Sequence, residues 1–108
     1  MWGQRTSDGR YALVYNPHPV ERFPLVVVHG DDGVRFSGMR VVFGDKPPLR
    51  YPGLHKVPGP QYVRGISEWS SDGSWKDSAM WVCYSVNKED IWVSRVPLDG
   101  KHVRENSR

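Results

Sequence analysis

The chain has 108 residues, of which 38% are hydrophobic and 12% aromatic. This length suits one small domain, and the apolar content is too high for a disordered chain. Fifteen basic and twelve acidic residues leave a formal charge of +3, and the two signs are interspersed. The composition therefore favours a solvated surface over a nucleic-acid-binding patch.

Disulfide, metal and membrane chemistry have little support in the sequence. Cys83 has no second cysteine to pair with and lies in an apolar run, so we expect a small core residue rather than a nucleophile. The four histidines are isolated and lack the short spacings that zinc requires: His18, His29, His55 and His102. No apolar run approaches the roughly 20 residues of a membrane span. We expect no metal, no cofactor and no membrane partner. The N-terminal residues show no signal-peptide pattern, so we expect none in this chain.

The first 43 residues predict four short strands joined by turns. The expected strands cover residues 2–6, 10–16, 25–29 and 34–43. Asp8-Gly9 is a hairpin signal between the first two, and Pro17 ends the second. Ser37-Gly38 is typical of a β-bulge in the fourth strand. No helical periodicity intervenes, so the pattern predicts an antiparallel meander.

The stretch from Phe23 to Phe36 is the clearest strand–turn–strand unit. Leu25 to Val28 is a short, mostly β-branched apolar run with the composition of a buried strand. Asp31-Asp32-Gly33 predicts a tight turn, because aspartate carboxylates accept bonds from nearby backbone N–H groups and glycine adopts a positive φ.

The second half of the chain repeats the pattern after a long connection. Residues 44–60 are rich in proline and glycine and predict an irregular loop. Three strands are then expected at residues 61–67, 79–85 and 91–96. Gly65, inside the first of these, suggests close approach of another backbone or a ligand. The polar end of the chain predicts a frayed tail.

These expectations define an all-β fold of antiparallel four-stranded meanders. Residues 1–43 form one blade, 44–60 a connecting loop, 61–97 an incomplete second blade and 98–108 a tail. A restart of this kind suggests the radial repetition of a β-propeller, of which the chain covers about one and three-quarter blades. Because so few blades cannot close a ring, we expect the remaining blades or other copies of the chain as partners.

The turn after residue 30 resembles the Asp-box of sialidases and related propellers. That motif reads Ser-x-Asp-x-Gly-x-x-Trp/Phe, and Asp31, Gly33 and Phe36 match it, whereas His29 replaces the usual Ser or Thr. In that family the motif lies between the third and fourth strands of a blade, which is where the strand count places it here.

Three longer stretches extend the resemblance over most of residues 2–97. Residues 4–17, 61–66 and 85–97 resemble the C-terminal part of bacterial proteins described as sialidase-like or BNR-repeat glycosidases. The resemblance implies a carbohydrate-active protein: the C-terminal fragment of a sialidase-like glycoside hydrolase, inactive alone. The alternative is a non-catalytic sugar-binding or interaction module built from propeller blades. Both interpretations imply a carbohydrate partner, and neither implies a nucleic-acid partner. The location of the parent protein stays open, and a secreted or periplasmic one is compatible with the resemblance.

Glycosidases need an acid and a base or nucleophile, and in a propeller these lie near the axis on the innermost strands. The expected inner strands carry four polar residues: Gln4, Arg5, Arg64 and Glu68. Arg5 and Arg64 are candidates for gripping a substrate carboxylate, and Glu68 is the candidate general acid. Alternatively, the two arginines pair with acids at a blade junction.

Other candidates have more ordinary interpretations. An Asp-box lies on the rim of a propeller, so Asp31 is expected to fold its turn rather than to catalyse. Trp69, in a polar loop, is a candidate for stacking on a sugar ring, whereas Trp81 and Trp92, inside strands, are expected in the packing between blades. The turn at residues 87–90 holds an acid, a base and an amide, but an exposed turn explains it equally well.

Overall fold

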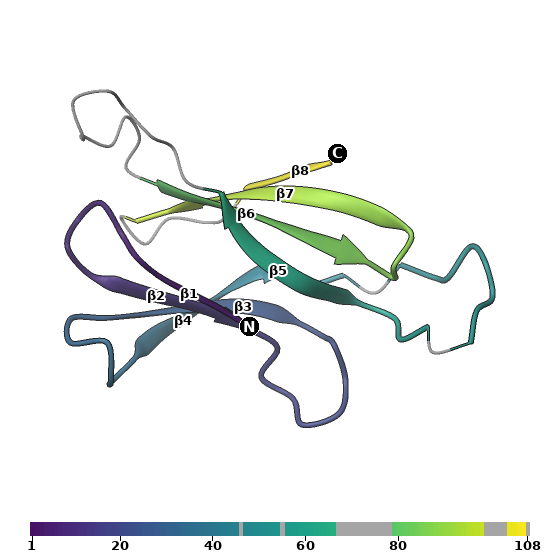
Figure 1. The fold of residues 1–108 in the computed structure, drawn as a ribbon, viewed down its shortest axis with the longest axis horizontal. Coiled ribbons are helices and arrows are strands. Elements are labelled where there is room, and N and C mark those ends of the chain that lie inside the picture. Colours follow the sequence, from purple (N-terminus) through teal and green to yellow (C-terminus); the bar gives the residue numbers. More distant parts are fainter. Residues whose placement is uncertain (46, 55, 67–78, 99–103, 108) are drawn as a thin grey trace.

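A computed structural model describes residues 1–45, 47–54, 56–66, 79–98 and 104–107, and these form two antiparallel sheets. The first sheet has the order β1-β2-β3-β4 and the second β5-β6-β7-β8 (Figure 1). No described segment forms a helix of the length and apolarity that a membrane span requires. The strands are β1 Trp2–Arg5, β2 Tyr11–Tyr15, β3 Leu25–Gly30, β4 Ser37–Phe43, β5 Pro60–Ile66, β6 Ala79–Val86, β7 Asp90–Pro97 and β8 Arg104–Ser107.

The all-β class and the seven predicted strands are confirmed. Each predicted strand overlaps an observed one, and the largest difference is the start of β4, which lies at Ser37 rather than Val34. The predicted tail is wrong in part. Residues Arg104–Ser107 pair with β7 in an antiparallel register from Trp92↔Ser107 to Arg95↔Arg104, so the second sheet has four strands. Backbone pairing with a neighbouring strand satisfies the N–H and C=O groups of this polar segment without any apolar side chain.

Local sequence explains the first sheet. β3 is its buried central strand: Leu25, Val26 and Val27 are each at most 1% exposed. The β1–β2 hairpin closes through the Thr6 N–H donating to the Arg10 carbonyl at 2.8 Å. The predicted bulge in β4 is confirmed, because the β3–β4 register shifts between Val27 and His29, opposite Gly38, which has a φ of +68°.

The two sheets pack face to face over one core. β2, β3 and β4 contribute Ala12, Val14, Leu25, Val27, Val42 and Phe43, and the second sheet contributes Val63, Met80, Val82, Tyr84, Val86 and Val96. β1 approaches β5 and β4 approaches β8, so the first and last strands of the two sheets are matched. Figure 1 shows that β1 and β5 also run in the same direction. The second sheet therefore stacks on the first in the same orientation, with equivalent strands adjacent to each other.

Aromatic side chains fill the centre of this core. The ring of Phe43 meets Tyr84 edge-on at 5.6 Å and Trp92 at 5.4 Å between centroids. The Tyr84 hydroxyl lies 2.7 Å from Ser94 Oγ, and both groups are buried. Trp92 packs against the core as predicted. Trp81 lies on the opposite face of β6, partly buried, with its indole N–H lacking a partner.

Candidate functional site

Gln4 lies at the junction between the two sheets. Its Oε1 accepts a hydrogen bond from the Trp2 indole N–H at 2.7 Å. A Cβ placed on Gly65 would lie 2.2 Å from both Trp2 Nε1 and Gln4 Oε1, so a larger residue at this position of β5 would have to displace these two side chains. Close approach at Gly65 is confirmed, but the approaching atoms belong to two side chains of β1 rather than to another backbone or a ligand. Gln4 is engaged in holding the sheets together.

Arg5 and Arg64 lie on opposite sides of the molecule. Successive side chains alternate between the faces of a strand. Gln4 and Gly65 face each other across the sheet junction, so Arg5 and Arg64 each point away from it. Arg5 lies over the Tyr11 ring at 5.8 Å, and Arg64 donates to the Val63 carbonyl at 2.9 Å. Within one chain the two arginines are not brought together, and a shared carboxylate clamp does not form from them.

Two further predicted site residues, Glu68 and Trp69, lie outside the described residues. The predicted general acid and the predicted sugar-stacking ring are therefore supported by the sequence argument alone.

The aspartate turn folds as predicted, but through the second aspartate. Asp32 Oδ1 accepts hydrogen bonds from the backbone N–H groups of Val34 at 2.9 Å and Arg35 at 2.8 Å. These bonds, that of Arg35 first, lower the pKa of Asp32 below its ordinary value. The motif match had pointed to Asp31 for this role. Phe36 and Gly33 border a shallow hollow over the free face of β1 and β2, and Gly33 has the positive φ expected of its position.

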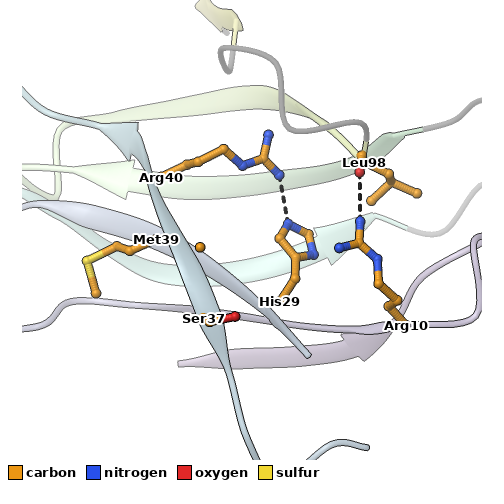
Figure 2. Close-up of a pocket in the computed structure, with 7 residues that line it drawn as sticks. Arg10, His29, Ser37, Met39, Arg40 and Leu98 are labelled. Carbon is orange, nitrogen blue, oxygen red and sulfur yellow. Dashed lines mark hydrogen bonds between the residues drawn. The ribbon is translucent and has the colours of Figure 1, made fainter. Parts of the chain in front are cut away.

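A second hollow, of about 490 Å³, opens at the edge of the sheet junction (Figure 2). We call it the histidine pocket; its lining is Arg10, His29, Ser37, Gly38, Met39, Arg40 and Leu98. Arg40 Nη2 donates to His29 Nε2 at 2.7 Å, and Arg10 Nη2 donates to the Leu98 carbonyl at 2.7 Å. Arg10 also forms an ion pair with Asp8, whose Oδ2 lies 2.8 Å from the arginine Nε. Figure 2 shows the three basic side chains pointing toward one another.

Burial and charge keep His29 neutral. The residue is only 7% exposed, and burial is the largest cause that lowers its pKa below 6.5. The positive charges of Arg40 and Arg10 lower it further, and Asp8 opposes them. Since an arginine always donates, Nε2 is the acceptor and the ring proton is on Nδ1. That Nδ1 is buried and has no hydrogen-bond partner.

The turn at residues 87–90 is an anchor rather than an exposed turn. The Glu89 side chain is 3% exposed and accepts bonds from Lys56 Nζ at 2.6 Å and from the backbone N–H of Tyr51 at 2.8 Å. Lys56 is the main cause that lowers the pKa of Glu89 to about 2. Asn87 Oδ1 accepts from the Gly59 N–H at 2.7 Å. These contacts fasten the long loop of residues 44–59 to the second sheet.

The described residues contain no group of three or more histidine, cysteine or acidic side chains that could hold a metal ion. No family model, curated protein or solved structure matches the chain.

Sequence reasoning missed the histidine pocket. One signal was present: His29 ends the most apolar run of the chain at the position where the resembling motif has Ser or Thr. Its pairing with Arg40 depends on the β3–β4 register, which the bulge shifts. Arg10 and Leu98 are 88 residues apart and meet only because the sheets stack.

Proposed function

We propose that this chain is part of a carbohydrate-active protein, the C-terminal pair of blades of a sialidase-like glycoside hydrolase. The observation that supports it is the stacking of two four-stranded meanders with like strands adjacent, β1 by β5 and β4 by β8. Blades of a propeller repeat in this way around an axis. The resemblance of residues 4–17, 61–66 and 85–97 to sialidase-like glycosidases points to the same architecture.

The free sheet faces support further blades as partners. Because β1 and β5 run in the same direction, two faces are equivalent: the face of the first sheet that points away from the second sheet (its free face), and the face of the second sheet that packs on the first (its packed face). On the packed face, the indole of Trp2 fills the space over Gly65. On the free face, a hollow of about 450 Å³ lies over Gly3, bordered by Tyr11 and Leu13. A further sheet, from the parent protein or another copy, fills this hollow in our proposal.

In this proposal each arginine serves a different blade junction. Arg5, on the free face of the first sheet, meets the inner strand of the preceding blade, and Arg64 meets that of the following blade. Their substrate contacts are then completed by residues outside this chain. This arrangement accounts for two exposed arginines that do not meet within the chain.

A non-catalytic sugar-binding or interaction module is the second candidate, and the described carboxylates Asp32 and Glu89 have structural roles in turns. Asp32 and Glu89 both accept several hydrogen bonds, and the pKa of each is lowered. A general acid at neutral pH needs a raised pKa, so neither suits that role. The catalytic reading therefore depends on Glu68 and on carboxylates of other blades.

Aryl glycoside hydrolysis separates the two candidates. We expect the purified chain to release no fluorophore from an aryl N-acetylneuraminide or from neutral aryl glycosides. The protein translated from the whole reading frame that contains this sequence is expected to hydrolyse at least one of them, and Glu68→Gln to abolish that activity. If the whole protein binds sugars but hydrolyses none, the binding module is correct. Turnover by the chain alone that Glu68→Gln removes would show that one pair of sheets suffices.

A further inference from the structure

A glycine in the first strand of each sheet shows how one sheet fits onto the next. Gly3 of β1 is flanked by Trp2 and Gln4, whose side chains point to the second sheet and lie against Gly65 of β5. A Cβ on Gly65 would collide with both of them. The position without a side chain in one sheet thus receives the two side chains that flank a glycine in the other.

The same pattern occurs again on the surfaces that point away from the sheet junction. Gly65 is flanked by Arg64 and Ile66, and because side chains alternate along a strand, both point away from the first sheet. Both residues are exposed, Ile66 by 41%. Gly3 faces the opposite way, toward the hollow of about 450 Å³ on the free face of the first sheet. The chain therefore carries an empty glycine hollow on one surface and two exposed flanking residues on the other.

Strand pairing gives the two glycines equivalent places in their sheets. Gly3 lies opposite Leu13 of β2, and Gly65 lies opposite Val82 of β6. Each glycine is thus in the first strand of its sheet, beside an apolar residue of the second strand. A surface with the features that meet Gly65 therefore suits Gly3 as well.

We propose that the hollow over Gly3 is a docking surface for a second copy of this chain, whose Ile66 inserts into it. The hollow is bordered by Tyr11, Leu13 and Phe36, so an apolar side chain suits it. The outward face of β5 carries such a side chain next to a glycine, as the required pattern demands. The proposal rests on the repeated stacking of the proposed function and identifies the covering sheet as the second sheet of another copy.

This contact joins two different surfaces, so it is heterologous. A copy that docks through Ile66 keeps its own hollow open, and oligomers grow as further copies are added. The junction also brings Arg64 of one copy to the strand that carries Arg5 of the next. Both arginines are exposed, so salt at about 0.3 M screens their repulsion, and association is measured at that concentration.

Two variants of opposite kind test the docking by sedimentation velocity. Ile66→Glu removes the inserted side chain and leaves the hollow intact. Gly3→Glu fills the hollow and leaves Ile66 intact, and its Cβ fits because its nearest neighbour, Leu13, lies 3.7 Å away. We expect each variant alone to associate at least about tenfold more weakly than the unchanged chain, because the burial of Ile66 is lost. Leu54→Glu, which changes a 90% exposed leucine of the long loop, is the matched control and associates like the unchanged chain.

An equal mixture of the two variants separates a heterologous contact from other kinds of association. The intact Ile66 of the Gly3→Glu chain meets the intact hollow of the Ile66→Glu chain, so we expect a dimer with one copy of each. This dimer does not grow, because each partner has lost its other surface. A mixture that stays monomeric, a mixture that grows beyond the dimer, or variants that associate alone like the unchanged chain would overturn the proposal.

Nuclear magnetic resonance of the unchanged chain gives a test that needs no variant and so decides the matter where a variant fails to fold. As the protein concentration rises, we expect the methyl resonances of Ile66 and the amide resonance of Gly3 to shift together, and those of Leu54 to stay in place. A chain that does not associate, or a Gly3 resonance that does not move while it does, would contradict the docking. Glycoside hydrolysis is measured on the whole protein, so the proposed function and this docking can fail separately.

Discussion

At the scale of single residues, buried polar groups differ in whether they have hydrogen-bond partners. Tyr84 and Ser94 pair with each other at 2.7 Å inside the core. His29 is satisfied at Nε2 and unsatisfied at Nδ1. Its neutral form fits beside two arginines, and its charged form does not, because burial and both positive charges oppose protonation. The ionisation of this one ring is therefore coupled to folding.

The pH dependence of unfolding tests that coupling. The pKa of His29 is lower in the folded state than its ordinary value of 6.5, so the unfolded chain binds the proton more tightly. The stabilisation that neutral His29 contributes is complete above about pH 6.5 and declines as the pH falls below that value. We expect urea unfolding midpoints to show this decline and His29→Phe to remove it between pH 7 and the onset of carboxylate titration. An unchanged profile in the variant would show that another group is responsible.

At the scale of elements, two contacts determine how strands and loops are placed. Gly65 lets the Trp2 indole and the Gln4 amide of β1 lie against β5. The Glu89 carboxylate accepts hydrogen bonds from Lys56 and from the backbone N–H groups of Arg50 and Tyr51. These bonds attach the long loop to the β6–β7 turn. The first contact sets the spacing of the sheets, and the second holds a proline-rich loop whose apolar side chains are all more than a third exposed: Leu49, Tyr51, Leu54 and Val57.

Gly65→Ala is expected to destabilise the protein by about 1–3 kcal/mol, the usual cost of overpacking a well-packed contact. The added methyl group would have to displace Trp2 and Gln4. Gly3→Ala is the matched control, because a Cβ there meets its nearest neighbour at 3.7 Å. Chemical denaturation of both variants gives the comparison, and equal stabilities would contradict the described packing.

The hydrogen bonds of Glu89 predict a second decrease in the stability of the protein, at more acidic pH. Because its pKa falls from 4.5 to about 2 on folding, this carboxylate stabilises the protein above about pH 4.5 and loses that effect as the pH falls toward 2. Glu89→Gln is expected to lower the thermal midpoint at neutral pH and to flatten its decrease over that acidic range. Limited proteolysis is expected to cut the loop of residues 44–59 faster in the variant. A loop that stays equally resistant would indicate that Asn87 alone holds it.

The sequence predicted the strands well because apolar runs and turn signals are local. It placed Leu25 in a buried strand, Gly38 in a bulge and Trp92 in the core, and all three are confirmed. Arrangements that depend on non-local contacts were not predicted. Within the chain, strand alternation at the sheet junction places Arg5 and Arg64 on opposite faces, and their contact with a ligand stays a prediction. The turn carboxylate is Asp32 rather than Asp31, and the strand at Arg104–Ser107 is recognisable only from its pairing with β7.

At the scale of the whole molecule, two outer sheet faces have no sheet packed on them among the described residues. The first carries Val41, 53% exposed; the second carries Ile66, 41% exposed, and Ile91, 63% exposed. Apolar faces of this kind associate in water. In the proposed architecture they are the surfaces on which neighbouring blades pack, so the isolated chain lacks two of its natural contacts.

Sedimentation velocity over a wide range of protein concentration tests this architecture most directly. We expect the isolated chain to form oligomers whose size grows with concentration. Val41→Asp, which puts a charge on the free face of the first sheet, is expected to shift the distribution toward the monomer. Val34→Asp, which changes an 80% exposed valine in the aspartate turn, is the matched control and is expected to leave it unchanged. A chain that sediments as a single monomeric species at every concentration would contradict the proposal that further sheets cover these faces.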